Sequence, residues 1–110
     1  MFLYKTTVQP SPIHGFGVFA EDSITQGEAV YRHRPELDLI FTKAEFGALG
    51  ARNRSLIKHF GGFDKRLSRY RLPYDNLRFL NHSDRPCLRY DPQTNQIIAL
   101  RDINAGEELT

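Results

Sequence analysis

The sequence predicts a mainly β protein with a short helical insert. Short apolar runs alternate with turns that contain proline or glycine near both ends of the chain, a pattern typical of small antiparallel sheets. The middle differs, because residues 42–60 combine a helix-start motif with apolar residues at helical spacing. With 110 residues, of which 40% are hydrophobic and 25% charged, the chain has the size and balance of one globular domain, residues 1–110.

The N-terminal third carries the first predicted strands. Residues 5–9 form one strand, and Pro10 and Pro12 should end it, because a proline nitrogen cannot donate to a sheet ladder. Further strands are predicted over residues 17–20, 28–31 and 37–41.

Two helices should follow. Thr42 and Glu45 stand at capping-box spacing, with Thr42 as the N-cap, and the helix that they begin should end near Gly50. A second helix is predicted over residues 51–60, with the glycine pair 61–62 as its stop. Its apolar face should comprise Leu56, Ile57 and Phe60.

The C-terminal third returns to β structure after a basic stretch, residues 65–71, that is expected to be a loop. Strands are predicted over residues 88–90 and 96–100, on either side of a turn at 91–95.

One short pattern, I-x-x-G-E, occurs twice, at residues 24–28 and 103–107. Gly27 and Gly106 should supply a φ that other residues resist. The match is too short to indicate a repeat fold, so we expect two similar turns rather than a duplication.

Composition excludes several classes of function. The net charge is only +2 and no dense Lys/Arg run occurs, so a direct nucleic-acid partner is not expected. No apolar stretch is long enough to cross a membrane, and residues 1–5 lack the features of a signal peptide. The single cysteine, Cys87, cannot form an internal disulfide or a cysteine zinc cluster. We expect an intracellular, cytoplasmic protein, with the nucleus as the alternative.

Two polar motifs are candidates for a binding site. In His14-Gly15-Phe16-Gly17, the missing Cβ atoms would let the backbone approach a ligand, although an isolated G-x-G more often marks a tight turn. In residues 78–86, Asn81, His82 and Ser83 follow Phe79 and Leu80, which suggests a polar site in an apolar wall. The alternative is a hydrogen-bonded loop. No other His, Cys or carboxylate stands at metal-ligand spacing from His82, so a metal role for His82 is not expected.

The remaining candidates are weaker when taken alone. Residues 106–110 predict a turn that enters a strand, with both glutamates facing solvent. Four aromatic residues could line a channel, although aromatic residues are more often core: Tyr70, Tyr74, Phe79 and Tyr90.

Taken in order, the G-x-G motif, the R-F-L-N-H-S-x-x-P segment at 78–86 and the closing G-E-E-L-T at 106–110 resemble the SET domain of protein lysine methyltransferases. The likeness runs from Val8 to Thr110 and is weakest over residues 31–73. The lack of cysteine-rich zinc segments is similar to the compact, stand-alone members of that family.

The resemblance implies a β-clip-like fold of several small curved sheets, in which the C-terminal segment threads in a knot-like way and brings Asn81 beside the closing strand. It also implies S-adenosylmethionine as the cofactor. The backbone of His14, Gly15, Phe16 and Gly17 would hold its methionine end. Its adenine and ribose side would lie against Asn81 and His82, with Arg78 and Phe79 alongside.

The implied activity is methyl transfer to a lysine of a protein substrate, and the alternative is a catalytically silent domain that binds the cofactor or a protein partner. In the family, a tyrosine that orients the amine follows the segment that ends here at Thr110. We therefore expect a SET domain truncated at its C-terminal end, with little activity of its own and Tyr74 as the first substitute for that tyrosine. We also expect an unpaired strand edge near Leu109, through which the chain could dimerise.

Overall fold

A computed structural model describes all residues, 1–110, and the chain divides into two compact units. The first unit contains Met1–His33 and Phe79–Thr110, and the second contains Arg34–Arg78. The second unit therefore coincides closely with the segment in which the sequence motifs are weakest.

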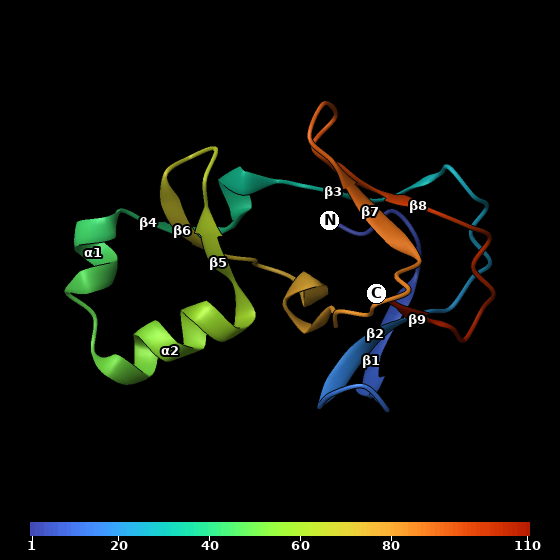
Figure 1. The fold of residues 1–110 in the computed structure, drawn as a ribbon, viewed down its shortest axis with the longest axis horizontal. Coiled ribbons are helices and arrows are strands. Elements are labelled where there is room, and N and C mark those ends of the chain that lie inside the picture. Colours follow the sequence, from blue (N-terminus) through green and yellow to red (C-terminus); the bar gives the residue numbers. More distant parts are fainter. The chain divides into compact units, whose positions relative to one another are not determined.

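The first unit contains two antiparallel sheets of three strands each (Figure 1). One sheet has the order β1-β2-β9, with strands β1 (Thr6–Pro10), β2 (Phe16–Ala20) and β9 (Glu108–Leu109). The other has the order β3-β8-β7, with strands β3 (Ala29–Arg32), β8 (Gln96–Ala99) and β7 (Leu88–Asp91). The strands predicted in this part of the chain are thereby confirmed to within about one residue at most ends.

One boundary prediction was wrong, because Pro10 is the last residue of β1 rather than the residue that stops it. Pro10 lies opposite Phe16 in the register of the β1–β2 hairpin. Strand β1 is at the edge of its sheet, where the missing proline N–H costs little.

The two I-x-x-G-E segments pair with each other. Ile24 and Ile103 form an antiparallel bridge, and each backbone N–H donates to the other residue's carbonyl at 2.8 Å. The N–H of Gly27 donates to the carbonyl of Ala99 at 2.8 Å, and the N–H of Gly106 donates to that of Ala20 at 2.7 Å. We call residues 20–31 the first arc and residues 99–110 the second arc.

The backbone hydrogen bonding between the arcs continues into the strands. The N–H of Ala99 donates to the carbonyl of Glu28 and the N–H of Ala20 to that of Glu107, both at 2.9 Å. The hydrogen bonds of one arc therefore repeat those of the other at equivalent positions. Gly27 and Gly106 have φ values of +87° and +91°, which confirms the prediction that the turns need glycine. The pairing of the arcs with each other was not predicted.

The core of the first unit forms where the arcs cross. Each arc places an apolar residue with no exposed surface at the equivalent position of its strand, Val30 in β3 and Leu109 in β9. Ile24 and Ile103 are also buried, as is Val18 on β2, which pairs with Leu109. Burial of such side chains from water is the main stabilising contribution to a domain of this size.

The second unit packs two helices with one small sheet and also contains the 3₁₀ turn η1 and all but the last residue of the 3₁₀ turn η2 (Figure 1). The sheet has the order β4-β6-β5, with strands β4 (Leu39–Phe41), β6 (Arg69–Leu72) and β5 (Gly62–Asp64). The helices are α1 (Lys43–Gly47) and α2 (Ala51–Phe60), and the 3₁₀ turns are η1 (Pro35–Leu37) and η2 (Asn76–Phe79). No helix of the chain combines the length and the apolar character that crossing a membrane requires.

Helix starts were predicted well in this unit. The capping box is present, because Thr42 Oγ1 accepts from the Glu45 N–H and Glu45 Oε1 accepts from the Thr42 N–H. Helix α2 has the predicted bounds, but its predicted apolar face was partly wrong. Ile57 is buried, whereas the side chain of Leu56 is 46% exposed, because neighbouring positions differ by about 100° around a helix.

Two strand predictions in this unit need correction. The strand expected over 37–41 begins only at Leu39, because Pro35 starts the 3₁₀ turn η1. The stretch 65–71 is not a loop throughout, since its last residues form β6, the central strand of the sheet. Asp64 Oδ1 accepts from the backbone N–H groups of Arg66 and Leu67, which closes the β5–β6 turn. The basic residues interspersed in this hairpin obscured its strand character.

Candidate functional site

Asn81 joins the separate motifs of the sequence in one place. Its side-chain nitrogen Nδ2 donates toward the carbonyls of His14 and Phe16, each at 3.0 Å, and toward Glu108 Oε1 at 2.9 Å. The first two acceptors belong to the G-x-G turn, and the third belongs to the closing strand β9. The sequence motifs that were weak individually thus meet at one amide group, which we call the Asn81 hub.

Glu108 is held in this hub from two further directions. Its second carboxylate oxygen, Oε2, accepts from Ser11 Oγ at 2.9 Å. A Cβ atom added at Gly17 would lie only 2.0 Å from Glu108 Oε1, so a side chain there would displace the carboxylate. Gly17 is therefore required for the approach of Glu108.

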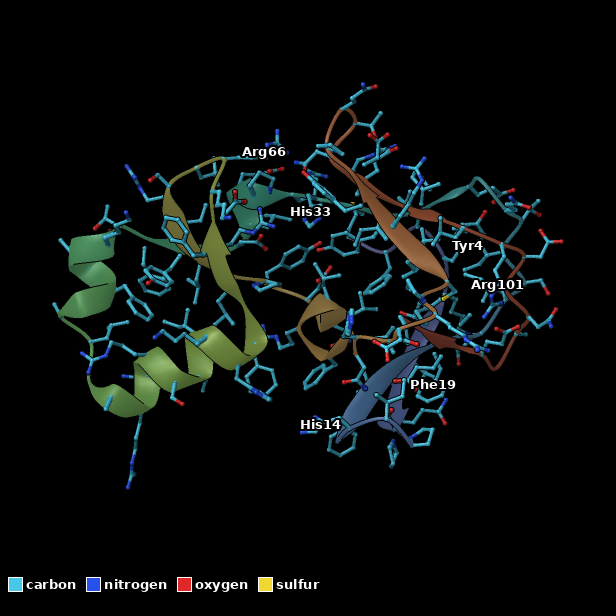
Figure 2. The ribbon with its side chains drawn as sticks, viewed as in Figure 1. Tyr4, His14, Phe19, His33, Arg66 and Arg101 are labelled. Atoms are coloured by element: carbon cyan, nitrogen blue, oxygen red, sulfur yellow. The ribbon has the colours of Figure 1, made fainter.

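The G-x-G turn is built by local hydrogen bonds. The N–H of Ser11 donates to the Gly15 carbonyl at 2.8 Å, and Ser11 Oγ accepts from the Ile13 N–H at 3.0 Å. Gly15 has φ +47°, the left-handed region that favours glycine. His14 lies at the tip of the hairpin, away from Phe19 further along β2 (Figure 2). Carbonyl oxygens of this turn therefore face Asn81. Their hydrogen bonds order both the turn and the Asn81 side chain.

A hollow of about 400 Å³ lies beside the hub within the first unit. It is lined by Leu80, Asn81, His82, Pro86, Leu88, Arg89, Tyr90, Ile97 and Thr110. The wall is thus mostly apolar and includes the Asn81 amide as a polar group. This combination is typical of sites for small organic molecules.

The predicted site residues are not all at this hollow. Asn81 and His82 line it, although the His82 side chain is 90% exposed and so lies at the rim. Residues 14–17 do not line it, and only the carbonyls of His14 and Phe16 are linked to it, through their hydrogen bonds from Asn81. Arg78 instead donates to the carbonyls of Pro73 and Asp75, at 2.8 and 3.2 Å, and so stabilises the preceding loop.

Tyr74, the predicted catalytic residue, belongs to the second unit, and its role stays a prediction. Its backbone N–H donates to Asp38 Oδ1 at 3.0 Å, and the same carboxylate is 3.3 Å from the guanidinium Nε of Arg71. Partial desolvation and the neighbouring Asp75 carboxylate raise the pKa of the Tyr74 hydroxyl. At neutral pH this hydroxyl therefore remains protonated and can donate a hydrogen bond.

The other aromatic candidates separate into core and site. Tyr70 stacks on Phe46 with ring centroids 3.6 Å apart, so it belongs to the core of the second unit. Tyr90 lines the hollow, and its hydroxyl donates to Asn95 Oδ1 at 2.9 Å.

Sequence reasoning missed Ser11 and Glu108, and the expectation that both glutamates of G-E-E face solvent was wrong. Glu107 does point outward and pairs with Arg101 at 2.8 Å, whereas Glu108 enters the hub. Glu107 precedes β9, and strand alternation places Glu108 on the face opposite the buried Leu109. The alternation therefore does not mark Glu108 as part of the site, and its role depends on the Ser11 and Asn81 partners that the fold brings to it.

The expected unpaired strand edge near Leu109 was also wrong. Leu109 is fully buried, and β9 pairs with β2 on one side. On the other side, the N–H of Leu88 donates to the Thr110 carbonyl at 3.0 Å, and the N–H of Cys87 donates to Thr110 Oγ1 at 3.4 Å. The closing strand thus lies between β2 and residues 87–88, and dimerisation stays an untested prediction.

The comparisons with known proteins agree with this geometry. A model of the SET domain family matches residues 15–110, which include the G-x-G turn, Asn81 and Glu108. The chain belongs to the SET domain family. The resemblance proposed from the sequence motifs, and the mainly β fold of small sheets that it implied, are thereby confirmed.

A solved structure supports the fold of this SET domain. It is a Plasmodium falciparum protein described as a "putative histone methyltransferase", and its TM-score with the present chain is 0.63. The two are 18% identical over 96% of this chain and 90% of the other. No curated protein sequence is significantly similar to the chain. No group of three or more His, Cys, Asp and Glu side chains in the structure could hold a metal ion.

Proposed function

We propose that this SET domain binds S-adenosylmethionine in the hollow beside Asn81 and transfers its methyl group to a lysine of a partner protein. One observation carries the proposal: the Asn81 amide joins the G-x-G turn to the closing strand and lines a hollow of about 400 Å³. Membership of a family of protein lysine methyltransferases, and the fold shared with a described histone methyltransferase, support it.

The residues of the hollow fit this cofactor. Its volume falls in the range of about 300–1,000 Å³ that is usual for small-molecule sites. Leu80, Leu88 and Ile97 offer apolar surface for a flat base, and Asn81 offers a hydrogen-bonding amide. When bound, S-adenosylmethionine would supply an activated methyl group on a sulfonium.

The chain's own contribution would be to bind, orient and exclude water. The hub fixes one wall of the hollow, and positioning of two reactants accounts for much of the acceleration in a displacement reaction. A lysine that enters an apolar site beside a cation would lose its proton more easily, because burial and like charge both lower an amine pKa. The partner implied by this chemistry is a protein that presents an accessible lysine.

A second candidate, a SET domain that binds cofactor without turnover, is favoured by the state of Tyr90. This tyrosine lines the hollow, and its hydroxyl is already engaged as a donor to Asn95 Oδ1 at 2.9 Å. A radiolabelled methyl-transfer assay with lysine-containing protein substrates separates the candidates, since only the first predicts incorporation of label.

Calorimetric titration of S-adenosylmethionine tests the binding step that both candidates share. We expect Asn81→Ala to weaken binding by about 1–3 kcal/mol, roughly ten- to hundred-fold, because it removes a hydrogen-bonding group of the site. Asn53→Ala removes an exposed amide from α2 and is the matched control. No heat of binding with the wild-type chain would contradict the proposal, and so would unchanged affinity of Asn81→Ala.

A further inference from the structure

We propose that Glu108 is a positioning residue, which fixes the Asn81 amide so that Oδ1 is the atom presented to a ligand in the hollow. This inference rests on the proposed function for the identity of the ligand. The Glu108–Asn81 contact itself belongs to the ligand-free protein and can be tested there.

More acceptors surround the side-chain nitrogen of Asn81 than it has hydrogens to donate. Its Nδ2 group has two hydrogens, yet three acceptors lie within 3.0 Å of it, namely two carbonyls and the Glu108 carboxylate. If the amide rotated by half a turn, Oδ1 would face three oxygens, one of them charged. That arrangement is repulsive, so the surroundings select one orientation of the amide.

The selected orientation leaves a defined acceptor. No protein group in the structure donates to Asn81 Oδ1, although Asn81 lines the hollow. A ligand group that meets this oxygen must therefore be a hydrogen-bond donor. Without the carboxylate, only two neutral carbonyls would oppose rotation, and the preference for this orientation would be weaker.

The position of Glu108 is itself determined by the fold. Its backbone is opposite Phe19 in the β2–β9 register, and its carboxylate lies over Gly17, where a Cβ would not fit. Ser11 holds the second carboxylate oxygen at 2.9 Å. Two residues that make no contact with the hollow, Ser11 and Gly17, thus act on the site through Glu108.

The first experiment follows the Asn81 side-chain NH₂ resonances by NMR in the absence of ligand. We expect slow hydrogen exchange in the wild type, fast exchange in Glu108→Ala, and intermediate exchange in Glu108→Gln, whose amide oxygen can still accept. Glu107→Gln is the matched control, because Glu107 lies next in sequence but pairs with Arg101. Equal exchange in the wild type and Glu108→Ala would overturn the inference.

The second experiment is a double-mutant cycle on S-adenosylmethionine affinity. We expect Glu108→Ala to weaken binding about ten-fold, Glu108→Gln about two- to three-fold, and Glu108→Ala to have no further effect in an Asn81→Ala background. Additive effects would show that Glu108 acts independently of Asn81, which contradicts the inference.

A variant that disrupts the structure less than Glu108→Ala serves as a control for misfolding. Ser11→Ala leaves Glu108 in place but frees one carboxylate oxygen, and we expect about a two- to three-fold loss of affinity, again absent in the Asn81→Ala background. If the wild type binds no S-adenosylmethionine, the proposed function fails, and the ligand-free NMR result still decides the role of Glu108.

Discussion

The two arcs of the first unit share a backbone design but differ in what they carry. Both cross through the Ile24–Ile103 bridge, and both turn at a glycine with positive φ. The first arc ends at Tyr31, which is buried and packs edge-on against Phe2 with ring centroids 4.9 Å apart. The second arc ends at Thr110, which lines the hollow.

The difference lies in side chains on equivalent strands. Where the first arc has Ala29 opposite Ile98 of β8, the second arc has Glu108 opposite Phe19 of β2. Both arcs therefore bury apolar residues in the core, and the second also places a charged group at the Asn81 hub. The two arcs thus differ in a few side chains placed on a repeated backbone pattern, not in their local fold.

The largest expected loss of stability comes from substitutions at the bridge where the two arcs cross. Ile24→Ala and Ile103→Ala should each destabilise the protein by about 2–5 kcal/mol, because both side chains are almost completely buried. Equal losses in urea unfolding would show that the arcs contribute equally to the core. Leu56→Ala removes a largely exposed leucine from α2 and should cost much less. A small effect of either isoleucine variant would contradict the symmetric description.

The next test concerns the two turns. Gly27→Ala and Gly106→Ala should each cost roughly 1–2 kcal/mol, since an L-residue resists a positive φ. A Cβ atom added at either position would meet no other atom within 4 Å, so the strain is conformational rather than steric. Thermal unfolding measures both variants, and Gly47→Ala on α1 is the control that should not destabilise. Unequal losses would show that one arc tolerates strain better than the other.

The smallest expected effect concerns acid stability of the second arc. The backbone N–H of Asn104 and the guanidinium of Arg101 lower the pKa of the Glu107 carboxyl. Its contribution is present above the unfolded-state pKa of about 4.3 and is lost as the pH falls through the lower folded-state value. Glu107→Gln should therefore lose about 0.2–1 kcal/mol at pH 7 and show a shallower decline in acid.

Urea unfolding from neutral pH down into the acid range measures this effect. Glu28→Gln is the counterpart in the first arc, where Glu28 is exposed and no ion pair forms, so a smaller change is expected. A steeper acid decline for Glu107→Gln than for the wild type would contradict the assignment.

Much of the first unit could be predicted because its strands are short, punctuated by turns and internally consistent. The β1–β2 hairpin and the strands on either side of the 91–95 turn depend on local sequence, and the structure has them. The pairing of Ile24 with Ile103 depends on contacts between residues distant in the chain. No local pattern indicates such a contact, although the repeated I-x-x-G-E did locate its two ends.

The site was predicted in part for a similar reason. Asn81 and the G-x-G turn were identified from motifs, and they do meet. Glu108 was taken for a solvated charge, because the residue type alone favours the surface. Its environment depends on Ser11 and on the space above Gly17, which only the folded structure reveals.

The Ile24–Ile103 bridge also has a consequence for how the chain folds. It joins residues far apart in the sequence, so a long loop must close before this contact forms, and such closure slows folding. During synthesis the second unit, Arg34–Arg78, can leave the ribosome whole before the first unit has received strands β7, β8 and β9. The Asn81 hub requires Glu108, which is the first residue of β9 and is synthesised after β7 and β8. We therefore expect the site to assemble late, after the second unit has folded around its own small sheet.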